Sequence, residues 1–96
     1  MDIAAFETSL AAAAPPDGMG GALRALWWDA KGDWARAHAA AQEDEGDAAH
    51  DWVHAYLHRK EPDPANAAYW YRRAGKPVHR GPLEAEWREI AATLLA

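Results

Sequence analysis

The stretch Glu61-Pro62-Asp63-Pro64 constrains the fold more than any other, because two prolines flank an acid that can cap a helix. A proline disfavours helical dihedrals in the residue before it, so Pro62 is expected to end a helix near Glu61. The Asp63 carboxylate can accept from the free backbone N–H groups of a following helix. Pro64 suits the first helical position, where no N–H is needed. The sequence therefore predicts a sharp corner between two helices.

The helix after this corner is bounded at its other end by Gly75 and Pro77. Glycine readily adopts the left-handed conformation that stops a helix, and a nearby proline blocks its continuation. Between the corner and Gly75, apolar residues recur at i, i+3, i+4 and i+7, which defines one helix face. These residues are Ala67, Trp70, Tyr71 and Ala74. With the amphipathic stretch before the corner, they predict a helical hairpin over residues 48–75.

A shift of 30 residues superimposes this hairpin on an earlier part of the chain. Gly32-Asp33 falls on Pro62-Asp63, so each segment has a helix breaker followed by a capping acid. The apolar positions also coincide: Ala25 with Ala55, Ala37 with Ala67, and Ala40-Ala41 with Trp70-Tyr71. Two copies of one structural unit produce such a pattern. We therefore predict an earlier hairpin over residues 22–45.

Two further amphipathic stretches lie outside the hairpins. Apolar residues recur at helical spacing in both: Ile3, Phe6, Leu10 and Ala13 in the first, and Leu83, Trp87, Ile90, Ala91 and Leu94 in the second. The second stretch falls where a third, truncated hairpin would begin. The prediction is a single all-α domain over residues 1–96 with about six helices: an N-terminal helix 2–14, hairpin 22–45, hairpin 48–75 and a closing helix 82–95.

The second hairpin resembles a known repeat family. Its pattern D-x-x-x-A-x-x-W-Y-x-x-A is similar to tetratricopeptide-like repeats and, more closely, to the Sel1-like variety; the residues are Asp63, Ala67, Trp70, Tyr71 and Ala74. The run 52–77 also resembles a group of small uncharacterised bacterial-type proteins. The first hairpin departs from the pattern, with Ala40-Ala41 in place of Trp-Tyr. The resemblance covers residues 22–75 and implies an α-α superhelix, but no activity.

Composition argues against several classes of protein. The net charge is −5, and the first 51 residues hold ten acids and three bases, which does not favour nucleic-acid binding. No apolar run approaches the 18 or so residues of a membrane span. The N-terminus has no basic signal region. We expect a cytoplasmic protein without a membrane partner.

The sequence offers little for catalysis. There is no cysteine, Ser9 is the only serine, and no glycine-rich phosphate loop precedes a lysine. Acid–base work by His54 or His58 is conceivable, but any helix with histidines offers as much. We therefore expect no enzymatic activity and no cofactor.

The residues most suggestive of metal chemistry are His50, His54 and His58, at i, i+4 and i+8 of one predicted helix. Neighbouring members project from one face and can share an ion. The alternative is that they pack at a helix–helix seam and hydrogen-bond to carboxylates such as Asp51. No HExxH motif is present, and the acidic run 43–47 lacks the spacing of an EF-hand loop. A small metal- or ligand-binding protein is therefore the alternative function.

The function that the repeat predicts is binding of a protein or peptide. Stacked hairpins form a concave face lined by the first helix of each pair. The polar and aromatic residues expected there are Arg24, Trp28, Asp51, His54, His58 and Arg88. Because arginine binds carboxylates through two parallel hydrogen bonds, we expect a partner segment that bears carboxylates.

A second cluster is basic. Four cations gather at and after the end of the last hairpin helix: Arg72, Arg73, Lys76 and Arg80. Cations at this position complement the negative end of a helix, which explains them without a ligand. The functional interpretation is capture of an anion or an acidic peptide.

Overall fold

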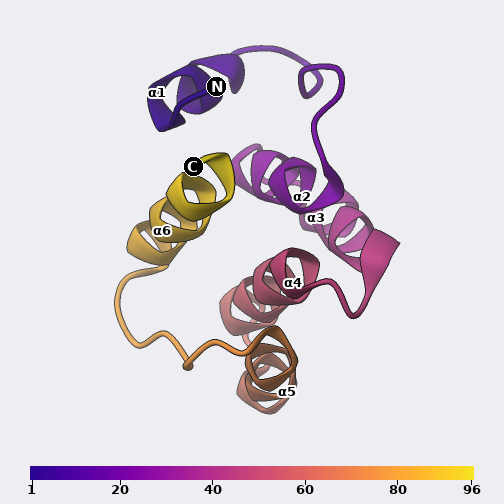
Figure 1. The fold of residues 1–96 in the computed structure, drawn as a ribbon, viewed down its shortest axis with the longest axis vertical. Helices are drawn as coiled ribbons and strands as arrows, with labels where there is room; N and C mark the ends of the chain where they lie inside the picture. The colour runs from indigo at the N-terminus through magenta and orange to yellow at the C-terminus, as the bar shows by residue number, and fades with distance from the viewer.

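The computed structural model describes residues 1–96, and its regular secondary structure is entirely helical (Figure 1). The six α-helices are α1 (Ile3–Ser9), α2 (Gly21–Ala30), α3 (Trp34–Ala41), α4 (Ala48–Lys60), α5 (Pro64–Ala74) and α6 (Leu83–Leu95). A single 3₁₀ turn, Gln42–Asp44, follows α3. None of the helices combines the length and apolar character that crossing a bilayer requires. The predicted all-α class is confirmed.

The caps at the corners form as the sequence predicts. The Asp63 carboxylate accepts from the Asn66 backbone N–H at 3.2 Å, and Pro64 is the first residue of α5. Gly75 ends α5 with a φ of 71°, a left-handed conformation that glycine adopts without steric cost. At the equivalent earlier corner, the Asp33 carboxylate accepts from Arg36 N–H at 3.0 Å. The breaks at residues 32 and 62 are therefore placed correctly by the sequence.

Two predicted helices are shorter than expected. The predicted helix 2–14 ends at Ser9, because the next three residues donate to carbonyls three residues back instead of four. The Lys31 ammonium also donates hydrogen bonds to the carbonyls of Leu10 and Ala12, at 2.7 and 3.0 Å. The third helix likewise stops at Ala41 and tightens into the 3₁₀ turn.

The helices form two antiparallel hairpins, α2 with α3 and α4 with α5. Helix α4 is central and contacts α2, α3, α5 and α6. In Figure 1, α6 lies to the left of α2 and α4, while α3 lies to their right. Helix α6 contacts both α2 and α4, and α1 packs on α6. Helix α6 therefore packs beside the first helix of both hairpins.

The indole N–H groups of three tryptophans join different helices. Each donates to an oxygen on a neighbouring helix: Trp27 to Ser9 Oγ at 3.1 Å, Trp34 to the Leu57 carbonyl at 3.2 Å, and Trp87 to the Leu26 carbonyl at 3.0 Å. A buried indole needs such a partner, because an unpaired donor costs about 1–3 kcal/mol. These bonds therefore fix how α1, α3 and α6 sit on the rest of the fold.

Two buried carboxylates join α4 to α2 and to α6. Asp29 on α2 accepts from the Tyr56 hydroxyl and the Lys60 ammonium, each at 2.9 Å. Glu86 on α6 accepts from Arg59 at 3.0 Å and from the Tyr71 hydroxyl. Burial raises the pKa of both tyrosines well above its ordinary value, and the neighbouring carboxylates add to the rise. Both hydroxyls therefore keep their protons and act as donors.

Gly21, the first residue of α2, provides a test of the packing between the hairpins. A Cβ at this position would overlap His50 Nε2 and lie 3.1 Å from a Glu43 oxygen. Glycine to alanine in a helix ordinarily stabilises by up to about 1 kcal/mol. Here we expect Gly21→Ala to destabilise by about 1–2 kcal/mol in urea unfolding, because the His50 ring must move away.

The matched control is Gly20→Ala, because the space around Gly20 is open. Because Gly20 is the N-cap of α2, where glycine is preferred to alanine, this variant should lose up to about 1 kcal/mol, and a His50→Ala background should leave that loss unchanged while it relieves the loss in Gly21→Ala. A Gly21→Ala variant as stable as the wild type would show that His50 does not pack against α2.

Candidate metal centre

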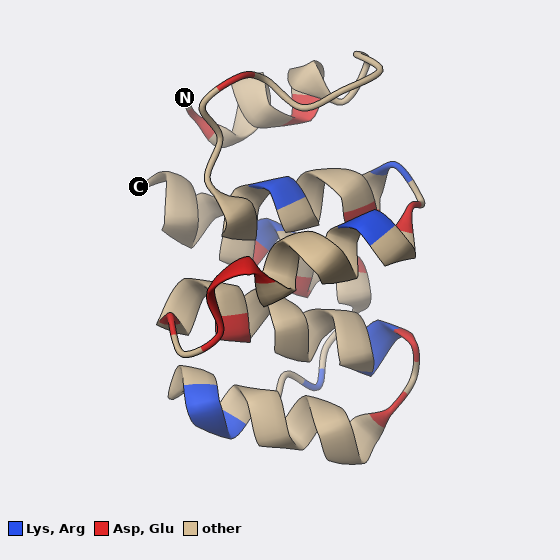
Figure 2. Cartoon of the chain, turned by 90° about the vertical axis from the view of Figure 1, so that its right-hand side faces the viewer, with Lys and Arg blue, Asp and Glu red and all other residues tan.

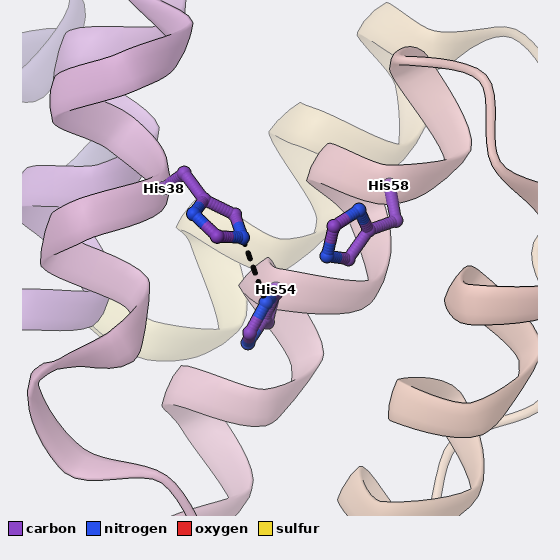
Figure 3. Close-up of side chains that lie close together, drawn as sticks. All are labelled: His38, His54 and His58. Atoms are coloured by element: carbon purple, nitrogen blue, oxygen red, sulfur yellow. Dashed lines mark hydrogen bonds between the residues drawn. The ribbon is translucent and has the colours of Figure 1, made fainter.

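Three histidine side chains converge between α3 and α4. His38 comes from α3, and His54 and His58 come from successive turns of α4 (Figure 3). The Nε2 atoms of His38 and His54 are 3.1 Å apart, and one ligand nitrogen from each of the three rings lies within 4.8 Å of the others. The cluster therefore presents three imidazole nitrogens to one small volume.

The predicted metal set was His50, His54 and His58, and the structure places His50 outside the cluster. His50 Nδ1 is bonded to Asp47 Oδ2 at 2.7 Å, and the ring lies against α2 at Gly21. Eight residues along a helix rotate the side-chain direction by about 80°, so His50 and His58 face different neighbours. His38 takes the third position instead. Its one sequence signal is its place four residues after Trp34, beside the apolar face of α3.

Two tryptophans enclose the imidazoles. Trp34 stacks on His38 with ring centres 4.6 Å apart, and Trp70 stacks on His54 with ring centres 3.9 Å apart. His54 and His58 are buried, with 2% and 6% of their surface exposed, while His38 is half-buried. The rings thus lie in a setting of low polarity that opens toward solvent at His38.

A regular seam between α4 and α5 holds the two α4 histidines. His58 lies opposite Asn66 and His54 opposite Trp70, and one turn earlier Asp51 lies near Arg73 at 3.9 Å. The spacing is that of two antiparallel helices in contact, and the caps of α5 fix its register. The rotamers of these histidines are therefore set by tertiary packing.

The hydrogen bonds of His58 assign its tautomer. Its Nδ1 lies 3.0 Å from Glu61 Oε1, and its Nε2 lies 3.2 Å from Asn66 Nδ2. In a neutral ring with hydrogen on Nδ1, the first bond is a donation to the carboxylate. Nε2 then carries the lone pair and accepts from the amide. A carboxylate behind a histidine in this way is the usual companion of a metal-ligating imidazole.

The pKa values of two histidines are depressed. Burial, together with the nearby charges of His38, His58 and Arg73, lowers the pKa of His54 to about 4. Burial also lowers the pKa of His38, with a contribution from His58. Both rings are therefore neutral near pH 7, which is the form that binds a metal. His54 Nδ1 is buried without a hydrogen-bond partner.

The arrangement suits a transition-metal ion. Zinc binds imidazole nitrogen at about 2.0–2.1 Å, which places tetrahedral ligands about 3.3 Å apart. The 3.1 Å between His38 and His54 is close to this spacing, and a small movement of His58 would complete it. Imidazole ligands favour zinc, copper, nickel and cobalt over calcium or magnesium.

The residues predicted for a partner site do not gather on one face. Asp51, His54 and His58 are buried in the seam described above. The other three lie apart and are engaged locally: Arg24 with Glu43 at 2.6 and 2.8 Å, Trp28 beneath Arg36, and Arg88 with Glu7 at 2.7 Å. Asp51 accepts from the Gly46 N–H at 3.1 Å.

The predicted anion-binding residues divide into two pairs. Arg72 and Arg73 lie at the exposed C-terminal end of α5, where Figure 2 shows basic residues below the acidic segment that joins the hairpins. Lys76 and Arg80 line a separate hollow, in which the Lys76 ammonium lies 4.2 Å from the centre of the Trp52 ring. The structure therefore does not bring the four cations together.

A comparison of the chain with protein-family models, with curated proteins and with solved structures finds no match. The resemblance to tetratricopeptide and Sel1-like repeats stays a prediction.

The depressed pKa values predict an acid-sensitive fold in a metal-free buffer. The unfolded chain takes up protons near pH 6.5, whereas folded His54 resists protonation until about pH 4. The unfolded state thus binds more protons, so stability falls as the pH drops below 6.5. Between pH 7 and pH 5 we expect a loss of about 2 kcal/mol in urea unfolding.

Most carboxylates remain ionised between pH 7 and pH 5, so the loss of stability arises mainly from the protonation of histidine. A His54→Gln variant should lose clearly less stability than the wild type between the same two pH values. Equal losses in the two proteins would show that His54 is not the group responsible.

Proposed function

We propose that this protein binds a divalent transition-metal ion, of the class of zinc, through His38, His54 and His58. The observation that supports the proposal most strongly is the convergence of three imidazole nitrogens from two helices. Three histidines with one further ligand form a common zinc environment. The depressed pKa values of His38 and His54 leave their nitrogens free of competing protons near neutral pH.

The metal interpretation also accounts for the close approach of two imidazole nitrogens. The His38 and His54 Nε2 atoms face each other at 3.1 Å, and without an ion only one of them can carry the hydrogen of their shared bond. An ion among the rings would use the lone pairs of all three and fix one tautomer for each.

The test is stabilisation by metal. Because the ion binds only the folded site, Zn²⁺ or Co²⁺ at 100 times its dissociation constant should raise the free energy of unfolding by about 2.7 kcal/mol. His38→Ala and His54→Ala should each lose most of this gain. Chemical denaturation with and without the metal, after treatment with a chelator, measures both quantities.

His50→Ala is the matched control, because His50 lies on the same helix but outside the cluster. It should keep the full metal effect. Loss of the effect in His50→Ala, with retention in His38→Ala, would support the set predicted from sequence and contradict the site proposed here. Absence of any metal effect in the wild type would contradict metal binding itself.

Binding of a protein or peptide is the second candidate function, and one observation favours it. An open groove of about 520 Å³ lies between α1, α2, α4 and α6. Its apolar lining includes Leu10, Leu83 and Trp87. Its two cations are paired with acids that also line the groove, Lys60 with Asp29 and Arg88 with Glu7. We propose that the groove accepts an apolar side chain flanked by a carboxylate that displaces the exposed Glu7 from Arg88.

Peptides with a leucine or phenylalanine next to an acid provide the probe for this groove. Binding, followed by NMR shifts of α6 residues, should weaken in Arg88→Ala and at about 0.5 M salt, because exposed ion pairs are screened. Arg36→Ala removes an exposed arginine outside the groove and should have no effect. Shifts confined to other helices would contradict the proposal.

A further inference from the structure

Asn66 places an amide group beside the histidine cluster from a third helix. Its Nδ2 lies 3.2 Å from His58 Nε2, the nitrogen that carries the lone pair. The backbone N–H of Asn66 is held by the Asp63 cap, so the first turn of α5 has a fixed position. The amide therefore faces the nitrogen that the proposed metal would use.

We infer that Asn66 is the fourth ligand of the metal site, binding the ion through its side-chain oxygen. This inference rests on the proposed function and adds a residue from α5 that the sequence does not single out. The complete set is then three imidazole nitrogens and one carboxamide oxygen, contributed by α3, α4 and α5.

The interatomic distances support a four-membered set. In a tetrahedral zinc site with bonds of about 2.0–2.1 Å, every pair of ligand atoms lies about 3.3 Å apart. The His38–His54 distance is 3.1 Å, and the Asn66–His58 distance is 3.2 Å. These two pairs share no atom, so they can become opposite edges of one tetrahedron when the two pairs close around an ion. Both edges already have nearly the required length.

The Asn66 amide has a partner in both the metal-free and the metal-bound protein. In the metal-free protein its N–H donates to the His58 lone pair. When the ion takes that lone pair, it occupies the direction in which the amide N–H now points. The Asn66 side chain must then rotate by about 180° and move aside, so that its oxygen faces the ion at about 2 Å.

The nearby carboxylates are engaged elsewhere. Glu61 bonds to Nδ1 of His58, on the ring edge away from Asn66, where it orients the ring. The Asp63 carboxylate caps α5 through the Asn66 N–H. Asn66 is therefore the polar side chain in contact with the nitrogen that would bind the ion.

Co²⁺ is the probe, because its visible absorption depends on the number and type of its ligands. Wild type, Asn66→Ala and Asn66→Asp are titrated with Co²⁺ alone, and Zn²⁺ competition then gives the zinc affinity. Asn66→Asp supplies a charged oxygen at the same position, so we expect at least about tenfold tighter binding and a shifted spectrum. Asn66→Ala should bind at least about tenfold more weakly, with a spectrum changed by loss of one protein ligand.

The outcomes separate this inference from the proposed function. If wild type binds Co²⁺ and both variants match it in affinity and spectrum, Asn66 is not a ligand, while the histidine site stands. Weaker binding by Asn66→Ala with an unchanged spectrum assigns Asn66 a structural role and also overturns the inference. If wild type shows neither a Co²⁺ spectrum nor stabilisation, both proposals fall. Thermal unfolding of each metal-free variant checks that the fold is retained.

Discussion

The structure depends on the burial of α4 on every side. Eight consecutive residues of this helix, Asp51–His58, are buried, which is more than two full turns. A helix buried all round is ordinarily apolar all round. This one carries a carboxylate and two imidazoles within the buried span. Because a buried polar group without a partner is costly, the helices around α4 must supply partners at fixed positions.

The neighbours meet most of this demand, His54 Nδ1 excepted, with different chemistry on different sides. Toward α2 and α6, carboxylates join α4 through Tyr56 and Arg59. Toward α3 and α5, the contacts are imidazole, indole and amide groups around His54 and His58. In the second set, the depressed pKa values of His38 and His54 keep these two rings neutral near pH 7. The proposed metal site would therefore be a consequence of how the fold surrounds a buried polar helix.

Interactions between residues close in the sequence made the helices predictable. The members of the histidine cluster depend on contacts between helices, and these could not be predicted from the sequence. The caps at Asp33 and Asp63 act within four residues, so the corners could be located from sequence alone. One apolar face of α4 was also evident, but its burial on all sides was not, because that depends on where α6 packs. His54 and His58 were found by their spacing. His38 and Asn66 join them only after two helix–helix contacts form, and no periodicity encodes such contacts.

The two sides of α4 should respond differently to their surroundings. Carboxylates that are paired in the folded state stay ionised at mildly acidic pH, so the contacts of α4 with α2 and α6 persist there. The imidazole side loses stability below pH 6.5, where the unfolded chain gains protons. Protons and a metal ion compete for the same nitrogens, since a ligating imidazole must be neutral. The ion would bridge α3, from the first hairpin, to α4 and α5 of the second. Its affinity would then include the free energy of docking one hairpin on the other, which links metal occupancy directly to the packing of the two hairpins.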